Sequence, residues 1–258
     1  MKFAVTKEAL LEGLQRIQNV VSTRSTLPVL TNALLETTKT GLRLTTTDLE
    51  VAIRCEIVAQ VEKAGATTLP ARRLAAIVRE LPASEISLET DAKNISTLRC
   101  GASFLRYTAW PRGVSRLPSF KDAKTYTIRQ SELKDGLRRT SCAISVDETR
   151  YVLNGILFSF KENKLTLVAT DGRRLALFDS DLEFPRSHER DFIVPTKAVT
   201  ELQRMLGDEG EIQMSVGENL VSFEQNGSQL VSKLVEGNYP NYRQVIPGGS
   251  KGTHHHRA

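Results

Sequence analysis

The stretch VATDGRRLAL, residues 168–177, contains an Asp-Gly pair between apolar residues. Such a pair favours a tight β-hairpin. A related stretch, TTTDLEVAIR, lies at residues 45–54, and the Thr-Asp pairs of the two stretches are 123 residues apart. The recurrence of one turn signal at this distance predicts that a larger unit is duplicated.

The similarity continues on both sides of the two turns. An offset of 125 aligns LPARRLAAIVRELP (69–82) with VPTKAVTELQRMLG (194–207). Further matches, at the offset of 123, are Leu10 with Leu133, Gly13 with Gly136, Leu14 with Leu137, Leu30 with Leu153, Leu34 with Leu157, Leu42 with Leu165 and Leu44 with Leu167. We predict two copies of one domain, called the first copy (1–122) and the second copy (123–248) below. A tail at 249–258 follows, and no third copy is present in the sequence.

Each copy has the same predicted order of elements. A short strand leads into a helix, two strands run up to the Thr-Asp turn, and a further strand precedes a helix that begins with a proline, which the first helical turn tolerates. More alternating strands close the copy. In the second copy these segments are TYTI (125–128), the helix at 130–144, strands at 152–160 and 164–171, the helix from Pro195, EIQMSV (211–216) and LVSFEQ (220–225). Many strands and few helices predict an α+β fold.

The composition excludes several classes of protein. No apolar run is long enough to span a membrane, and the N-terminus lacks the pattern of a secretory signal, so we expect a cytoplasmic protein. Cys55, Cys100 and Cys142 are too far apart for a paired-cysteine zinc site and are odd in number, so we expect free thiols. The sequence therefore favours a reduced, globular protein with no metal centre.

No catalytic constellation is apparent in the sequence. It contains no glycine-rich phosphate loop, HExxH, G-x-S-x-G or CxxC motif. A hydrolase that uses Asp171 and His188 is the enzyme alternative, but no nucleophile or metal ligands accompany them. We expect Asp48 and Asp171 to shape their hairpins, His188 to lie in a loop, and the protein to be neither an enzyme nor a cofactor binder.

The predicted helices carry cations on the sides that face away from their apolar stripes. In the helix after Pro70, Leu74, Ile77, Val78 and Leu81 recur at helical spacing and would pack on a sheet. The cations on the other sides of the four helices are Lys7, Arg16, Arg72, Arg73, Arg79, Lys134, Arg138, Arg139, Lys197 and Arg204. If the two copies lie side by side, their helices would place these cations along one positively charged surface. Such a surface can follow the phosphates of a nucleic acid without reading bases.

Several long motifs together identify a family. MKFAVTKEALLEGLQ at the start, TLPVLTNALLE, ATTLPARRL, RYVLNGILF, LTLVATDGRRLAL and LVEGNYPNYRQVIP resemble the bacterial sliding clamp, the beta subunit of DNA polymerase III. The resemblance covers nearly all of residues 1–250. It implies a domain with two helices packed on antiparallel sheets, present three times in each family chain. Two such chains close head-to-tail into a ring around duplex DNA, with the basic helices lining the hole.

The resemblance also implies partners. The ring is a processivity factor that tethers the catalytic subunit of DNA polymerase III to double-stranded DNA and catalyses nothing itself. A clamp loader opens it, and other proteins with a clamp-binding motif share its peptide cleft. No cofactor is implied. Because these 258 residues hold two copies and not three, we do not expect the homodimer of the family from them alone.

The resemblance assigns two sets of site residues. The first set is for DNA: Arg24, Arg72 and Tyr151 come from the resemblance, and Arg73, Arg79, Arg138, Lys197 and Arg204 from the helix pattern. Val152 and Asp147 depart from the family pattern beside Tyr151. The second set forms the peptide-binding cleft, suited to a short extended peptide with aliphatic and acidic side chains: Leu153, Thr170, Gly172, Arg173, Arg174, Leu175, Pro240, Gln244 and Val245.

Two segments depart from the family pattern. After residue 247 the chain reads GGSKGTHHHRA, where the family continues into its third domain. FLRYTAWPRGVSRLPSF (104–120) holds four more residues than its counterpart in the second copy and contains the only Trp, Trp110. Reading-frame slips in the gene, or divergence of an edge loop, are the two hypotheses. The absence of a third copy leaves two functional alternatives, a truncated DNA-tethering clamp and a non-encircling fragment that binds clamp-binding peptides.

Overall fold

The computed structural model describes residues 1–21, 27–108, 120 and 123–246. The first copy consists of β1 (Lys2–Thr6), α1 (Lys7–Ile17), the 3₁₀ helix η1 (Pro28–Thr31), β2 (Asn32–Thr37), β3 (Gly41–Thr47), β4 (Val51–Val58), β5 (Gln60–Lys63), β6 (Ala66–Pro70), α2 (Ala71–Glu80), β7 (Glu85–Thr90), β8 (Ile95–Cys100) and β9 (Ser103–Thr108). Trp110, most of the segment 104–120 and the tail at 249–258 lie outside the described residues.

The second copy repeats this order, with an added 3₁₀ turn where the first copy has β5. It consists of β10 (Lys124–Arg129), α3 (Gln130–Ser141), η2 (Glu148–Leu153), β11 (Gly155–Lys161), β12 (Lys164–Thr170), β13 (Leu175–Asp181), η3 (Arg186–His188), β14 (Arg190–Pro195), α4 (Thr196–Met205), β15 (Glu211–Val216), β16 (Leu220–Gln225), β17 (Ser228–Lys233) and η4 (Tyr242–Val245). The predicted α+β class and the repeated order are both present.

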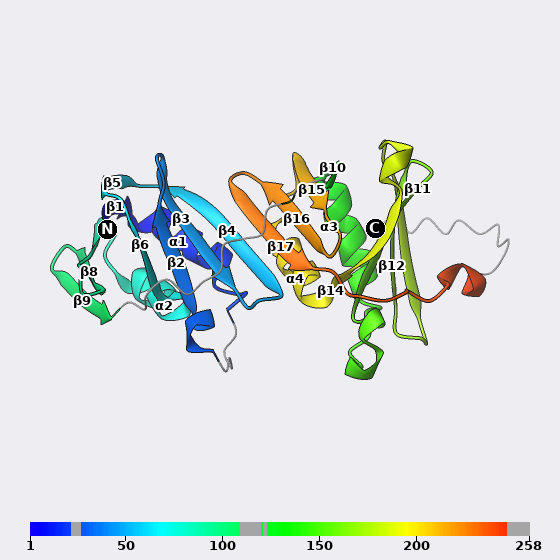
Figure 1. The fold of residues 1–258 in the computed structure, drawn as a ribbon, viewed down its shortest axis with the longest axis horizontal. Helices are drawn as coiled ribbons and strands as arrows, with labels where there is room; N and C mark the ends of the chain where they lie inside the picture. Colours follow the sequence, from blue (N-terminus) through cyan, green and yellow to red (C-terminus); the bar gives the residue numbers. More distant parts are fainter. Residues whose placement is uncertain (22–26, 109–119, 121–122, 247–258) are drawn as a thin grey trace.

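Three antiparallel sheets organise the molecule (Figure 1). A five-stranded sheet, β5-β1-β7-β8-β9, and a four-stranded sheet, β13-β12-β11-β14, each belong to one copy. The third sheet has eight strands, β10-β15-β16-β17-β4-β3-β2-β6, and runs through both copies. It is joined by β17 and β4, which pair from Ser228 opposite Cys55 to Ser232 opposite Val51. The counterparts of these two strands in the repeat, β9 and β13, are edge strands of their own sheets.

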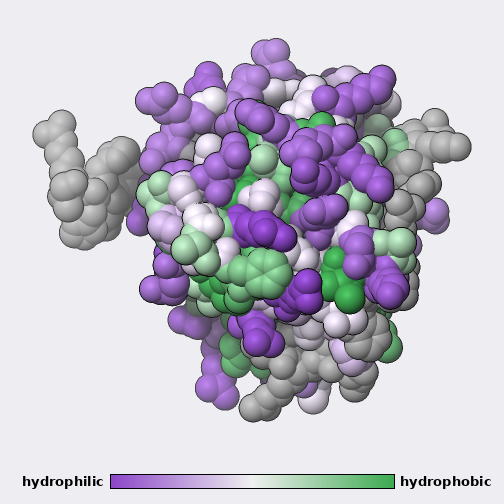
Figure 2. Space-filling model, turned by 90° about the vertical axis from the view of Figure 1, so that its left-hand side faces the viewer, coloured by the Kyte–Doolittle hydropathy of each residue, from purple (hydrophilic) through white to green (hydrophobic). Residues whose placement is uncertain are grey.

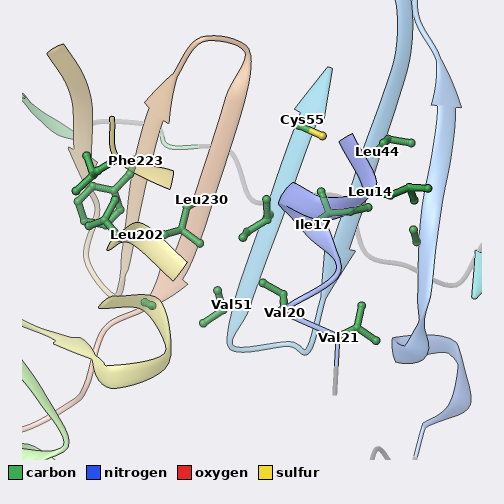
Figure 3. Packing of buried hydrophobic residues seen from close by; sticks show 14 of the residues in the cluster. Leu14, Ile17, Val20, Val21, Leu44, Val51, Cys55, Leu202, Phe223 and Leu230 are labelled. Carbon is green, nitrogen blue, oxygen red and sulfur yellow. The ribbon is translucent and has the colours of Figure 1, made fainter. Parts of the chain in front are cut away.

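One hydrophobic core continues through the junction between the copies. Leu14, Ile17 and Val20 come from the first copy, and Leu202 and Leu230 from the second (Figure 3). All five are fully buried. Because the same cluster includes side chains of both copies, burial of apolar surface stabilises the junction as well as each copy.

The repeated glycine of the first helix of each copy has a packing reason. A Cβ added at Gly13 would lie 2.7 Å from Leu44 Cδ1, and one at Gly136 would lie 2.7 Å from Leu167 Cδ1. Real Cβ atoms do not approach so closely, so only glycine allows the helix to lie this near the sheet. The match of Gly13 with Gly136 in the sequence therefore marks the closest approach of helix and sheet.

Four sequence predictions differ in detail from the structure. The two first helices end at Ile17 and Ser141, earlier than predicted. Residues 152–154, predicted as strand, belong to η2 or the link to β11. Pro70 and Pro195 end strands and cap the following helices instead of starting them, since extended proline backbone also suits the position before a helix. The hairpin at Asp171 has a four-residue loop, with Thr170 opposite Leu175.

The end of the first copy that carries β8 and β9 has a mostly hydrophilic surface with a hydrophobic patch near its middle (Figure 2). On the edge strand β9, the Phe104 side chain is 49% exposed. The guanidinium groups of Arg99 and Arg106 lie 5.1 and 5.3 Å from the centre of its ring. Edge strands with exposed apolar residues are sites where another strand can pair. None of the described helices has the length and apolar character needed to cross a bilayer.

Candidate nucleic-acid and peptide-binding sites

The four α-helices carry a net positive charge. Together they hold ten Lys or Arg and six Asp or Glu residues, a surplus of four positive charges. The whole chain has a surplus of five. The apolar stripes of α2 and α4 face the core through Leu74, Val78, Val199 and Leu202, as the periodicity predicts. The exposed helix sides are therefore where the chain can attract a polyanion.

Several of these cations have partners within the protein. Arg138 Nη2 donates to Asp135 Oδ1 at 2.9 Å, and this hydrogen bond, with that of Arg139, lowers the pKa of Asp135. Arg204 pairs with Glu201, whose side chain is 4% exposed. Burial raises the pKa of Glu201, and the charges of Arg204 and Lys197 act against that rise. A phosphate would have to share these arginines with the carboxylates.

Arg72 and Lys197, which occupy equivalent positions in the repeat, both reach the chain just after α1. Arg72 Nη2 donates to the Val21 carbonyl at 3.0 Å. Lys197 Nζ donates to the Val20 carbonyl at 3.1 Å and also pairs with Asp48. Two cations, one from each copy, thus converge on the carbonyl groups that precede residue 22. The candidate Arg24 lies outside the described residues.

The remaining DNA candidates are more open. Arg79, in the last turn of α2, is exposed. Arg73 lies over the ring of Tyr107, 6.0 Å from its centre. Tyr151 is 59% exposed on η2, so its ring is available for stacking. Asp147 caps η2: its Oδ1 accepts from the backbone and side chain of Thr149, and these hydrogen bonds lower the pKa of Asp147.

The Thr-Asp-Gly turn of the second copy is held by its own side chains. Thr170 Oγ1 donates to the Arg174 carbonyl at 2.7 Å and accepts from the Gly172 N–H at 3.1 Å. Asp171 Oδ1 accepts from the N–H groups of Arg173 and Arg174 at 2.9 and 3.0 Å. These backbone hydrogen bonds lower the pKa of Asp171 to about 2. The expectation that Asp171 shapes the hairpin is confirmed, and its carboxylate presents the arginines on a fixed loop.

The segment after β17 packs beside this turn. Leu175, Tyr239 and Tyr242 lie against a small cluster of Leu157, Val168 and Ile193. Burial raises the pKa of Tyr239 to about 12, and the backbone of Thr170 acts in the opposite direction. The structure therefore brings Thr170, Leu175 and the Tyr239–Pro240 step together, although they are far apart in sequence. Leu153 is buried, whereas Gln244 and Val245 lie exposed on η4.

Two pockets flank the segment after β17. One of about 490 Å³ lies between the segment 237–243 and the strands β11 and β14, and Pro240 is the predicted cleft residue that lines it. The other, of about 220 Å³, lies between η4 and the strands β11, β12 and β13, with Leu177 and Ile246 in its wall. Hollows beside an apolar cluster and arginines offer room for side chains of an extended peptide.

Arg150, which the sequence interpretation did not consider, lies between two groups of candidate residues. Its guanidinium Nε lies 3.3 Å from Asp147 Oδ2, and its Nη1 donates to the Asp171 carbonyl at 3.4 Å. It links η2, which carries Tyr151, to the Thr-Asp-Gly turn. A Cβ on Gly172 would lie 2.9 Å from Arg150 Nη1. Arg150 directly precedes the candidate residue Tyr151, so the sequence placed it near the site. The direction of its side chain depends on the conformation of η2.

Two copies of one α+β domain that share one sheet, with a surplus of positive charge on their helices, are typical of DNA-clamp folds. Residues 1–112 match the N-terminal domain family of the DNA polymerase III beta subunit, and residues 127–241 match its central domain family. The beta sliding clamp of Chlamydia muridarum is 34% identical over 247 residues, which span 95% of this chain and 68% of that protein. That of Proteus mirabilis is 37% identical over 255 residues, with 96% and 68% covered.

Solved structures agree. The DNA polymerase III subunit beta of Pseudomonas aeruginosa superposes with a TM-score of 0.92 at 34% identity, over 97% of this chain and 69% of that one. The sliding clamp of Bartonella birtlesii, solved bound to griselimycin, superposes with a TM-score of 0.91 at 35% identity, over 96% and 68% of the two chains. The chain belongs to the beta sliding clamp family, and its function is that of a DNA sliding clamp. It spans about two thirds of the length of these relatives.

Proposed function

We propose that this chain follows double-stranded DNA through its helix cations without reading the base sequence. The observation that carries the proposal is the surplus of four positive charges on the four helices, within a chain whose total surplus is five. The exposed candidates on the helices are Arg72, Arg73, Arg79, Arg138 and Arg204, and Lys197 is half-buried in the first turn of α4. Arg24, outside the described residues, is a further candidate. Tyr151 adds a surface on which a base can stack.

The salt dependence of DNA binding tests this proposal. Duplexes of unrelated sequence would be titrated with the protein by fluorescence anisotropy over a range of salt concentrations. The Arg79→Ala, Arg138→Ala double variant should lower the slope of log K against log salt by about 1.8, since each phosphate contact contributes about 0.9. Arg43→Ala is the matched control, because Arg43 pairs with Glu56 on β3 and β4, outside the helices. An unchanged slope, or a loss confined to one sequence, would contradict the proposal.

The second part of the proposed function is peptide binding at the Thr-Asp-Gly turn. Leu153, Thr170, Gly172, Arg173, Arg174 and Leu175, with Pro240, Gln244 and Val245, form the proposed cleft. The apolar contacts of Leu175 with the cluster beside Tyr239 and Tyr242 support it, since they give a floor edged by the two arginines. The proposed ligands are the clamp-binding segments of the DNA polymerase III catalytic subunit, the clamp loader and other partner proteins.

A charge placed in this floor should weaken peptide binding. Leu175→Asp should lower the affinity for a labelled peptide of alternating leucine and aspartate by about tenfold or more, because the apolar contacts of Leu175 would be lost and the new carboxylate would lie beside the aspartates of the peptide. Val58→Asp is the control, since Val58 is 82% exposed on the first copy. Circular dichroism would establish that both variants are folded. Equal affinity for Leu175→Asp and the unchanged protein would place the cleft elsewhere.

The proposed role is structural and electrostatic, without catalysis or a cofactor, in the cytoplasm. The domains proposed for it are residues 1–122 and 123–248. Assembly would use the edge strands β9 and β13, because their counterparts in the repeat, β17 and β4, pair across the junction. Sedimentation equilibrium of the 258-residue chain tests this: a discrete oligomer supports assembly through these edges, and a monomer at all concentrations favours the non-encircling, peptide-binding alternative.

A further inference from the structure

Lys197 lies at the N-terminal end of a helix, as does its counterpart Arg72 in α2. It lies in the first turn of α4, which begins at Thr196. The N-terminal end of a helix carries a partial positive charge, so a lysine there is destabilising unless an anion accompanies it. The anion is Asp48, which belongs to the first copy, and the Val20 carbonyl of the first copy accepts a second hydrogen bond at 3.1 Å. The ammonium group of the second copy is thus held by two groups of the first.

The two carboxylate oxygens of Asp48 have different partners. Oδ1 accepts from the N–H groups of Glu50 and Val51 at 3.0 and 2.7 Å and holds the turn between β3 and β4. Oδ2 pairs with Lys197. The Asp48 side chain is only 12% exposed, so this contact is shielded from solvent. In the second copy the equivalent oxygen, Asp171 Oδ2, pairs with Arg174 of its own turn at 3.1 Å.

Beside the shared core and the hydrogen bonds of Arg16 with Ser228 and of Arg54 with Gln229, the junction has two further features that bear on bending. On one side β17 and β4 form a continuous ladder. On the helix side, a groove of about 400 Å³ extends between residues of α1 and α4, lined by Glu12, Arg16, Glu201 and Arg204 among others. A single antiparallel ladder can twist about its length without losing its hydrogen bonds. Lys197 contacts the turn at the end of this ladder, where the Lys233 N–H donates to the Glu50 carbonyl, and it also reaches the Val20 carbonyl after α1, so it can resist twisting at this end.

We propose that Lys197 is a positioning residue, which with Asp48 sets the angle between the two copies. It acts on the curvature of the helix-bearing face and not through a phosphate of its own. The inference goes beyond the proposed function and reassigns one of its cations. The positioning role can be tested without DNA. It can therefore be wrong while the proposed DNA binding is right, and DNA binding can be wrong while the positioning role is right.

Distance measurements between the copies test the proposal. Cys142 is an exposed natural thiol in the second copy, and Glu80→Cys would place a second exposed thiol at the end of α2 in the first. Cys55 and Cys100 are buried and should not react. With spin labels on both exposed thiols, double electron–electron resonance reports the distance distribution. Lys197→Met and Asp48→Asn should each shift and broaden it, and the double variant should do no more than the larger single change.

Asp48→Asn keeps an oxygen for the turn and removes only the charge that faces Lys197. Two other variants, Asp171→Asn and Lys134→Met, serve as matched controls. Asp171→Asn makes the same change in the equivalent turn, which has no lysine of the other copy. Lys134→Met removes a lysine of similar exposure, which pairs with the exposed Asp208 inside the second copy. Both controls should leave the distance distribution unchanged. A distribution unchanged in Lys197→Met or in Asp48→Asn would overturn the proposal.

DNA binding separates positioning from phosphate contact. Asp48→Asn retains every cation, so a pure phosphate role for Lys197 predicts unchanged or tighter binding. A positioning role predicts that Asp48→Asn and Lys197→Met weaken binding by similar factors, with salt slopes close to that of the unaltered protein. A slope lower by about 0.9 in Lys197→Met, with no effect of Asp48→Asn, would show that Lys197 contacts a phosphate and would overturn the proposal.

Discussion

The Thr-Asp turns of the two copies are built by the same hydrogen bonds and used for different purposes. Thr47 Oγ1 donates to the Val51 carbonyl, and Asp48 Oδ1 accepts from two following N–H groups. Thr170 and Asp171 make the same contacts in the second copy. The first turn then receives Lys197 from the other copy, whereas the second turn keeps its carboxylate for Arg174 and presents it outward. A duplicated local structure can therefore serve as a junction in one place and remain an exposed turn, our proposed binding surface, in another.

The residue after each aspartate shows a second difference. Leu49 has φ of 79° and Gly172 has φ of 86°. The turn requires the left-handed region at this position in both copies, and that region favours glycine. The first copy tolerates a leucine there, 49% exposed, at a cost in backbone strain. Both copies thus make the same turn, and the glycine of the Asp-Gly pair allows the second copy to make it without backbone strain.

The largest expected effect is on the first turn. Asp48→Ala removes two backbone hydrogen bonds and leaves the half-buried ammonium of Lys197 without its anion. We expect a loss of about 2–3 kcal/mol in the free energy of unfolding, because hydrogen bonds to charged groups and unpaired charges carry large penalties. Asp171→Ala should have a smaller effect, since Arg173 and Arg174 can turn to solvent. Urea unfolding of the two variants checks the order, and equal losses would mean that Lys197 adds nothing.

The second effect concerns the glycine. Gly172→Ala forces a Cβ into the left-handed region and towards Arg150, and should destabilise the protein by about 1–2 kcal/mol. Gly227→Ala is a comparison without steric conflict: Gly227 also has positive φ, 70°, but a Cβ there meets nothing within 4 Å. The difference between the two losses isolates the clash with Arg150. A loss at Gly172 no greater than at Gly227 would show that Arg150 moves aside freely.

The reverse change in the first copy should be stabilising. Leu49→Gly relieves the strained backbone but gives the unfolded chain more freedom, so the expected gain is about 0.5–1 kcal/mol. Thermal unfolding would measure it, with Leu27→Gly as a control for loss of an exposed leucine. If Leu49→Gly lowers the melting temperature, the side chain of Leu49 contributes more than its backbone costs.

The smallest effect is the pH dependence of the second turn. The pKa of Asp171 is lowered to about 2 in the folded protein, from 3.8. A lowered carboxyl pKa adds stability above the unfolded-state value, and this contribution is lost as the pH falls from about 4 towards 2. The protection factors of the Arg173 and Arg174 amides, which correct for the intrinsic pH dependence of hydrogen exchange, should therefore fall across this range. Asp171→Asn should flatten the profile, and an unchanged profile would assign the dependence to another carboxyl group.

Much of this architecture could be predicted because it depends on local pattern. The match of Gly13 with Gly136, the apolar stripe from Leu74 to Leu81 and the Thr-Asp pairs each act within a few residues, so the sequence shows them directly. The helix ends were less predictable, because the turn after Ile17 is set by packing. The neighbour of β4 was not predictable at all, since its partner β17 lies some 175 residues away and many strands have similar alternation.

The sequence by itself determined the duplicated α+β domain, the membership of the beta sliding clamp family and the sign of the charge on the helices. Only the tertiary structure decided what each charge contacts. Lys197 and Arg72 are equivalent in sequence, yet one crosses to Asp48 of the other copy and the other stays within its own. The physical reason is that hydrophobic periodicity is a property of neighbouring residues, whereas an ion pair depends on where the folded chain brings distant groups together.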